Sequence, residues 1–195
     1  MADAAQLRLN SVLSDLPTDL NWVLWVNSLF NRTSMMLRDQ FILLVEDDHN
    51  DTVLIRRAFQ KAGFGDNLKI VSDGGQAVQY LQGQKEYGDR ARFPLPFLLL
   101  LDLKMPGTDG FEVLQWIRRQ PDLKRLLVVV LTSSNLQADV DRAYDLGANS
   151  YLVKPVEFSQ MVNMIERFEA YWTELNRFPT PASTLKPPLA ETTTI

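Results

Sequence analysis

The sequence of 195 residues has no cysteine, a single histidine and no long apolar run. Without cysteine the chain can form neither a disulfide nor a cysteine-ligated metal site, and a reducing compartment is expected. No stretch reaches the roughly 18 apolar residues that span a bilayer. The N-terminal residues MADAAQLRLN do not resemble an export signal. We therefore expect a cytoplasmic protein without a membrane partner.

Positive charge is also scarce. The 20 Lys and Arg are outnumbered by 24 Asp and Glu, which gives a net charge of −4. Binding to nucleic acids relies on Lys and Arg to neutralise phosphates, so nucleic acid is not expected as a partner. The sequence contains no GxxxxGK[ST] or GxGxxG motif, so no motif of this kind predicts nucleotide binding.

What the chain does have is a repeated alternation of apolar runs and helical patterns. The apolar runs are continuous, which is typical of strands buried on both faces of a parallel sheet. Five strand–helix repeats predict an α/β, flavodoxin-like, doubly wound sheet with strand order 2-1-3-4-5 and helices on both faces. Strands are expected at 41–45, 68–71, 97–101, 126–132 and 150–155, and helices at 52–63, 76–81, 109–119, 135–147 and within 156–178. Asn50 or Asp51 is expected to cap the first of these helices and Asp109 the third, and a polar, proline-bearing loop is expected before the third strand.

The two ends differ from this middle part. Residues 1–40 form an N-terminal extension of uncertain structure, and a start of translation at Met35 or Met36 is an equal alternative. Residues 179–195 are rich in Pro and Thr and are expected to be disordered. The globular domain is expected to span residues 41–178. This leaves no room for an output domain, so the protein should act through a protein contact of its own.

Polar residues stand where the apolar strands end. Glu46, Asp47 and Asp48 follow the first strand, and Asp102 follows the third. These strands are neighbours about 4.8 Å apart in the expected order, so their carboxylates should crowd one another. Such crowding is unfavourable unless a cation is shared, and oxygen ligands without His or Cys favour a hard ion such as Mg²⁺.

The fourth and fifth strands add a hydroxyl and an ammonium group. Thr132 ends the fourth strand, and Lys154 follows the fifth, about 10 Å from Asp102 along the sheet edge. A flexible lysine stem covers much of that gap. A nucleophilic carboxylate, a Mg²⁺ cluster, a hydroxyl and an ammonium together favour phosphoryl transfer. Each residue alone is more often a turn or capping residue, so the prediction depends on the four strand ends together.

With these residues in place, the chain resembles the receiver domains of two-component response regulators over roughly residues 41–175. The resemblance is carried by ILLVEDD (42–48), LLLLDLKMPGTDGFEVL (98–114), VVVLTSS (128–134) and GANSYLVKP (147–155). The segments QGQKEYGDRARFPLP and EAYWTELNRFP further resemble single-domain regulators that serve bacterial phytochromes.

The resemblance implies a chemical role for each site residue. Asp102 would accept a phosphoryl group from a sensor histidine kinase, and a phytochrome-like kinase is one candidate. Asp47, Asp102 and the backbone carbonyl of Lys104 would ligate Mg²⁺, and Glu46 would act through water.

The remaining implied roles concern the response to phosphorylation. Thr132 would hydrogen-bond the phosphoryl group, Lys154 would pair with it, and Tyr151 would change rotamer as Thr132 is drawn in. The bond between Lys154 and Pro155 is expected to be cis.

Lys104 bears on two further questions. In the family, the second residue after the phosphoacceptor and the second after the threonine tune dephosphorylation, and these positions hold Lys104 and Ser134. The lifetime of the phosphoryl group is therefore not inherited from other members. The rival interpretation, a phosphatase of the haloacid-dehalogenase type, needs a general-acid Asp at the position of Lys104. A receiver-like module that only binds partners is a second rival, but such modules normally lack a site residue.

The resemblance also implies a responding surface. Helices 135–146 and 157–175 flank the fourth and fifth strands and are rich in apolar side chains, more than one sheet face needs. Part of this surplus is expected to form a face for a downstream protein or for a homodimer. The apolar residues in question are Leu136, Val140, Tyr144, Met161, Met164, Phe168, Tyr171 and Trp172.

Overall fold

The structure is a computed structural model that describes residues 41–63, 65–177 and 179. The expectations about the N-terminal extension, the start of translation and the C-terminal tail fall on residues that, Pro179 aside, lie outside this part. The described part contains five strands, which follow five of the apolar runs: β1 (Ile42–Val45), β2 (Leu68–Val71), β3 (Leu98–Leu101), β4 (Leu127–Thr132) and β5 (Ser150–Val153).

The strands form one parallel sheet in the order β2-β1-β3-β4-β5. The predicted order is therefore confirmed, and with it the flavodoxin-like class. The helices of the described part are α3 (His49–Lys61), α4 (Gly74–Gln82), α5 (Gly110–Arg119), α6 (Gln137–Asp145) and α7 (Phe158–Ala170). Short 3₁₀ turns occur at η1 (Gly65–Asn67) and η2 (Lys85–Gly88), and a π-helical segment, η3 (Tyr171–Leu175), continues α7.

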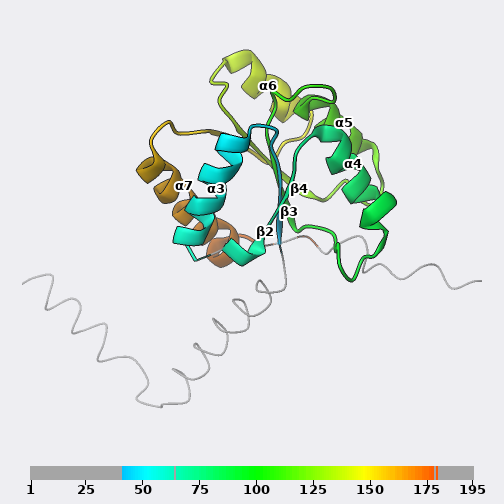
Figure 1. Cartoon of the computed structure of the whole chain (residues 1–195). Coiled ribbons are helices and arrows are strands. Elements are labelled where there is room, and N and C mark those ends of the chain that lie inside the picture. The colour runs from blue at the N-terminus through cyan, green and yellow to red at the C-terminus, as the bar shows by residue number, and fades with distance from the viewer. Residues whose placement is uncertain (1–40, 64, 178, 180–195) are drawn as a thin grey trace, which may run out of the picture. The chain divides into compact units, whose positions relative to one another are not determined.

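Helices cover both faces of the sheet (Figure 1). On one face, Ile55 and Phe59 of α3 and Ile165 of α7 pack on alternate residues of the strands, such as Leu44 and Leu100. On the other face, side chains of α4, α5 and α6 pack on the intervening strand residues. Because side chains alternate along a strand, each continuous apolar run supplies both cores at once.

The helix starts lie next to the strand ends. The prediction that Asn50 or Asp51 caps the helix after β1 is wrong, because Asp48 is the cap and its side chain accepts from the backbone N–H groups of both residues. The prediction that Asp109 caps α5 is confirmed. Its carboxylate accepts from the backbone N–H of Glu112, whose side chain accepts from that of Asp109 in return.

The connection from α4 to β3 is more ordered than its polar sequence suggests. Tyr87 of η2 is buried in contact with the rings of Tyr80 and Phe93. The guanidinium of Arg90 donates to the carbonyls of Tyr80, Leu81 and Phe93, which fixes the connection against the end of α4. Among the described residues no helix combines the length and apolar character needed to cross a membrane.

Candidate functional site

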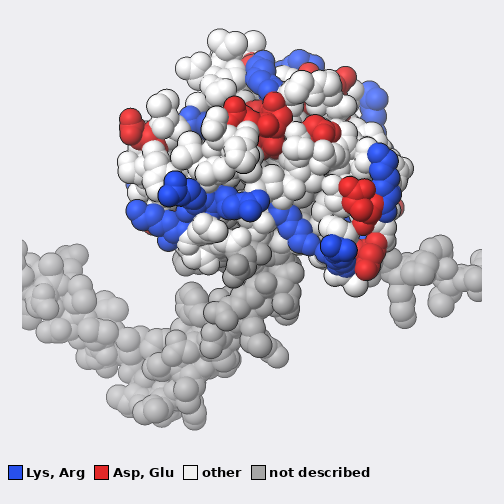
Figure 2. Space-filling model, viewed as in Figure 1, with Lys and Arg blue, Asp and Glu red and all other residues white. Residues whose placement is uncertain are grey.

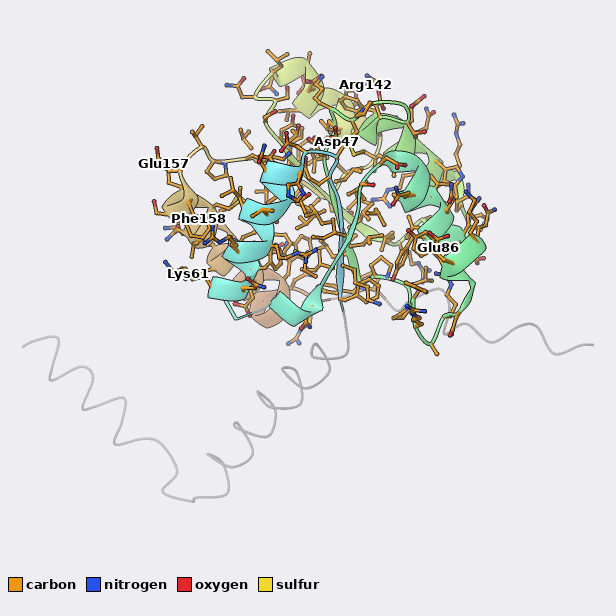
Figure 3. The ribbon with its side chains drawn as sticks, in the orientation of Figure 1. Asp47, Lys61, Glu86, Arg142, Glu157 and Phe158 are labelled. Carbon is orange, nitrogen blue, oxygen red and sulfur yellow. The ribbon has the colours of Figure 1, made fainter. Side chains whose placement is uncertain are left out.

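The site lies at the carboxyl ends of the strands. Val45 at the end of β1 is in register with Leu101 of β3, and the backbone N–H of Asp102 donates to the carbonyl of Val45 at 3.0 Å. The residues that directly follow the two strands are therefore side by side. Figure 3 shows Asp47 at this end of the sheet, and Figure 2 shows acidic side chains gathered on the same part of the surface.

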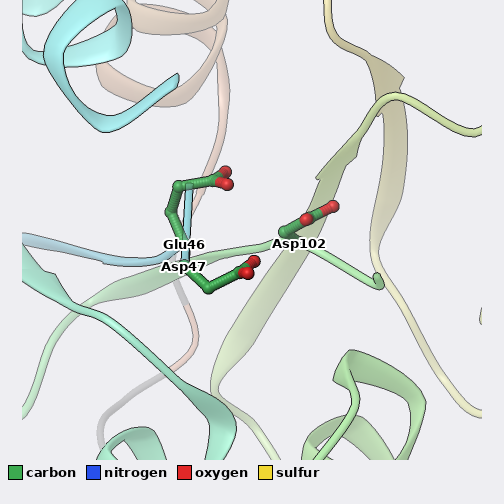
Figure 4. Close-up of side chains that lie close together, drawn as sticks. All are labelled: Glu46, Asp47 and Asp102. Atoms are coloured by element: carbon green, nitrogen blue, oxygen red, sulfur yellow. The ribbon is translucent and has the colours of Figure 1, made fainter. Parts of the chain in front are cut away.

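Three carboxylates converge there. One oxygen each from Glu46, Asp47 and Asp102 lies within 4.8 Å of the other two (Figure 4). Glu46 and Asp102 are buried, with 1% and 5% of their surface exposed, whereas Asp47 faces solvent. The Oδ1 atom of Asp102 also accepts from the backbone N–H of Leu103 at 2.8 Å. The crowding predicted from the strand ends is thus present.

Lys154 supplies a positive charge inside this cluster. Its Nζ lies 2.6 Å from Glu46 Oε2, 2.8 Å from Asp51 Oδ2 and 3.6 Å from Asp102 Oδ2. Burial by itself would lower the pKa of Lys154, but the contacts with Asp51 and Glu46 and the charge of Asp102 outweigh it and raise that pKa. Lys154 is therefore a fixed cation beside Asp102, held mainly by the other two carboxylates.

Burial raises the pKa of Glu46, whereas burial alone would lower the pKa of Lys154. Loss of water raises the pKa of Glu46 to about 7, although Lys154 and the backbone N–H of Asp48 both favour its ionised form. Three carboxylates with one exposed member form a donor set that suits a hard divalent cation. The residues present therefore fit a divalent metal site.

The hydroxyl groups of the site lie at the end of β4 and on β5. Thr132 is fully buried, and its carbonyl accepts from the backbone N–H of Lys154 at 2.8 Å. Its Oγ1 accepts from the backbone N–H of Ser134 at 3.4 Å. The Tyr151 hydroxyl donates to the carbonyl of Ser134 at 3.0 Å, so the loop after β4 is tied to β5.

Lys104 lies in the loop that follows Asp102, with an exposed side chain whose Nζ is 2.9 Å from Asp139 Oδ2. The position where a haloacid-dehalogenase phosphatase would carry its general acid therefore holds an ion-paired lysine. The expectation of a cis bond between Lys154 and Pro155 is wrong, since no cis peptide occurs in the described residues, in line with the usual trans preference of X-Pro bonds.

Sequence reasoning missed two of the acidic residues. Asp51 was considered only as a helix cap, and Asp139 was not singled out. Each lies in the first turn of a helix that follows a site strand, α3 for Asp51 and α6 for Asp139. The sequence therefore did contain a signal for both residues, namely an acidic side chain in the first turn of a helix that follows a site strand.

Comparison with known proteins identifies the family. The response regulator receiver domain family matches residues 42–166. The chain is 43% identical over 141 residues to the probable methanogenesis regulatory protein FilR2 of Methanothrix harundinacea, covering 72% of this chain and 88% of that relative. It is 41% identical over 138 residues to the response regulator Rcp1 of Synechocystis, covering 71% of this chain and 92% of Rcp1.

Solved structures agree with this. The phosphorylated cyanobacterial phytochrome response regulator RcpA is similar with a TM-score of 0.66 and 36% identity, over 72% of this chain and 99% of that one. The Mn²⁺-bound form of Rcp1 is similar with a TM-score of 0.64 and 40% identity, over the same shares of the two chains. With a family match over residues 42–166 and relatives above 40% identity, this chain belongs to the receiver domain family of two-component response regulators.

Proposed function

We propose that the chain is a stand-alone receiver that works in the cytoplasm. In this proposal Asp102 accepts a phosphoryl group from a sensor histidine kinase in a Mg²⁺-dependent reaction, and the protein signals by protein contact without a DNA-binding output domain. The observation that carries the proposal is the convergence of the carboxylates of Glu46, Asp47 and Asp102, two of which, Glu46 and Asp102, also lie beside the buried ammonium of Lys154.

The transfer step uses an oxygen of Asp102 as the nucleophile. A P–O bond forms to that oxygen, the P–N bond of the phosphohistidine breaks, and its electron pair stays on the imidazole nitrogen. Asp47, Asp102 and the backbone carbonyl of Lys104 would hold Mg²⁺, with Glu46 acting through water. When bound, the ion would supply charge neutralisation at the transferring phosphoryl group.

The other site residues would respond to the new phosphoryl group. Lys154, 3.6 Å from Asp102, would pair with it, and the hydroxyl of Thr132 would donate a hydrogen bond to it. Movement of Thr132 would disturb the loop that the Tyr151 hydroxyl holds at Ser134, so Tyr151 would change rotamer. The chain would thus catalyse only its own phosphorylation and dephosphorylation and would not turn over a separate substrate.

The proposed partners follow from the relatives and from the surface. Because Rcp1 and RcpA are similar proteins and the latter is described as a phytochrome response regulator, a phytochrome-like kinase is the proposed donor. The downstream partner would be a protein or a second copy of the chain that binds at α6, β5 and α7. Of the eight large apolar side chains that are exposed among the described residues, seven lie between Leu136 and Leu175.

The test is phosphorylation of the full chain by acetyl phosphate, with and without Mg²⁺. We expect the wild type to acquire about one phosphoryl group per chain only when Mg²⁺ is present, since the donor must approach a carboxylate cluster. Asp102→Asn should acquire none, while Asp122→Asn, a change at an exposed acid outside the site, should behave like the wild type.

Two outcomes would contradict the proposal. Normal labelling of Asp102→Asn would remove Asp102 as the acceptor. Steady hydrolysis of a generic phosphomonoester by the wild type would instead support the phosphatase interpretation.

A further inference from the structure

One carboxylate oxygen joins the two loops that border the site. Asp139 Oδ2 lies 2.9 Å from Lys104 Nζ and accepts a hydrogen bond from Ser134 Oγ at 2.6 Å. Lys104 belongs to the loop after β3, Ser134 to the loop after β4, and Asp139 to the first turn of α6. The side chain of Asp139 is mostly covered, with 15% exposed, whereas that of Lys104 is 53% exposed. The contact therefore links α6 to the residues that stand two positions after Asp102 and two positions after Thr132.

The charged groups around the contact between Lys104 and Asp139 lie close enough to shift the pKa values of their neighbours. Burial raises the pKa of the Tyr151 hydroxyl, and the charges of Asp139, Lys104 and Asp102 all act on it as well. The hydrogen bond from Ser134 and the ammonium of Lys104 lower the pKa of Asp139, to which Arg142, one turn away on α6, also contributes. Asp139 would therefore still have a nearby cation if Lys104 moved away.

A phosphoryl group on Asp102 would change the balance at Lys104. It carries a charge of about −1.5 to −2 where the free carboxylate carries −1. Lys104 is two residues along the chain, and its flexible, half-exposed stem moves at little cost. The ammonium of Lys104 would then have two competing anionic partners, one on Asp139 and one on Asp102.

We propose that Asp139 is a positioning residue that holds Lys104 and Ser134 in the unphosphorylated protein and competes with the phosphoryl group for the Lys104 ammonium. Phosphorylation then draws Lys104 away from Asp139 and releases the start of α6 from the loop after β3. Conversely, the pair between Lys104 and Asp139 weakens the affinity of the site for a phosphoryl group, because such coupling is reciprocal. This inference rests on the function proposed above.

The test is a titration of the full chain with beryllofluoride, a phosphoryl mimic, in the presence of Mg²⁺. Asp139→Asn keeps the size of the side chain and an acceptor for Ser134 but removes the charge that holds Lys104. We expect it to bind beryllofluoride about two- to fivefold more tightly than the wild type, the range of a partly exposed ion pair. Asp139→Glu should return the affinity toward the wild type.

Two controls separate the contact from a general change of charge. Asp141→Asn removes an exposed charge from the same helix, where Asp141 accepts only from Gln137 among the described contacts, and should leave the affinity unchanged. Asp139→Asn made in a Lys104→Gln background should also have no effect, because the competing ammonium is gone. Thermal unfolding of each variant checks that it is folded.

A spectroscopic measurement follows the ammonium itself. In protein with ¹⁵N-labelled lysine, the side-chain signal that disappears in Lys104→Gln should shift when beryllofluoride binds. Equal tightening in Asp141→Asn, tightening that persists without Lys104, or a Lys104 signal that does not move would each overturn the inference. A wild type that does not bind beryllofluoride at all would instead contradict the proposed phosphorylation of Asp102.

Discussion

At the scale of single residues, Lys154 and a bound divalent cation would both interact with the carboxylates of Glu46 and Asp102. Lys154 Nζ contacts Glu46 and lies near Asp102, and both of these carboxylates also belong to the acidic cluster. Asp47 is the exposed member of the cluster, and within the described part of the chain the ion pairs of Lys154 are with Glu46, Asp51 and Asp102. The two cations therefore share Glu46 and Asp102 but not Asp47, which gives a way to separate their roles.

We expect Asp47→Asn to weaken Mg²⁺ binding about tenfold or more, since even changes outside the ligand shell of a metal commonly cost 10–100-fold. Lys154→Met keeps most of the apolar stem but removes the charge, so Mg²⁺ should bind as well as before or more tightly. Lys154→Met should nevertheless lose the structural response to beryllofluoride. Isothermal titration with Mg²⁺ measures the affinities, and Asp51→Asn, which also contacts Lys154, serves as the matched control. Loss of the metal in Lys154→Met but not in Asp47→Asn would contradict this division of roles.

The site residues divide into those that the sequence could place and those that it could not. The position of Glu46, Asp102 and Thr132 at one edge of the sheet follows from the strand order alone, because parallel strands bring their carboxyl ends to one edge. Asp51 and Asp139 were missed because their positions depend on how far a helix extends toward a loop. That distance is set by the cap and the turn, and not by the apolar pattern.

At the scale of elements, the first turn of α5 packs directly against the backbone of Asp102 and Leu103, in the loop that precedes the helix. The backbone N–H of Gly110 donates to the carbonyl of Leu103 at 3.1 Å. A Cβ atom at Gly110 would overlap the carbonyl oxygen of Asp102 and meet the Cα of Leu103. The absence of a side chain there lets the first turn of α5 approach the loop that carries Asp102.

Gly110→Ala is therefore expected to destabilise the fold by about 1–3 kcal/mol, the usual cost of overpacking a close contact. The displaced backbone should also slow phosphorylation by acetyl phosphate. Gly88→Ala is the control, because a Cβ there meets only ordinary contact with the carbonyl of Gly83. Denaturant unfolding of both variants measures the difference in the free energy of unfolding. A Gly110→Ala protein as stable and as reactive as Gly88→Ala would show that α5 does not need this close approach.

The strands were predicted more closely than the helix starts. A continuous apolar run defines a buried strand directly, and β2 has the predicted bounds 68–71. The helix after β1 begins three residues earlier than predicted, at His49, because Asp48 supplies the cap. The connection before β3 was expected to be a polar loop, but Arg90 binds backbone carbonyls there and Tyr87 is buried. Polar composition does not reveal such internal partners.

At the scale of the whole molecule, exposed apolar side chains are concentrated at one end of the chain. Leu136 is 62% exposed and Val156 is 94% exposed, and the others in this region lie on α6, β5, α7 and η3. Among the strands of the described residues, β5 lies at the edge of the sheet with β4 as its one neighbour, so one side of its backbone has no strand partner within that part of the chain. Part of the predicted surplus proved to be core, since Met161, Phe168 and Trp172 are buried.

We expect the exposed remainder to support self-association that beryllofluoride and Mg²⁺ strengthen. Burying a Val or Leu side chain contributes about 1.5–3 kcal/mol, and each substitution in a symmetric dimer acts twice, so Leu136→Ser and Val156→Ser should each weaken association by about tenfold or more. Val53→Ser is the matched control, because Val53 is an exposed apolar residue on α3, away from these elements. Sedimentation velocity over a range of concentrations, with and without the mimic, gives the dissociation constants. A chain that stays monomeric in both states, or that responds to Val53→Ser as strongly as to Val156→Ser, would contradict a dimer through this surface. In that case the partner to be sought there would be a different protein.

Hydrogen exchange on the same samples locates the response independently. In the proposed response, the phosphoryl group acts through Thr132, Tyr151 and Lys154, so protection should change at α6 and β5 and not only at α3 and α4.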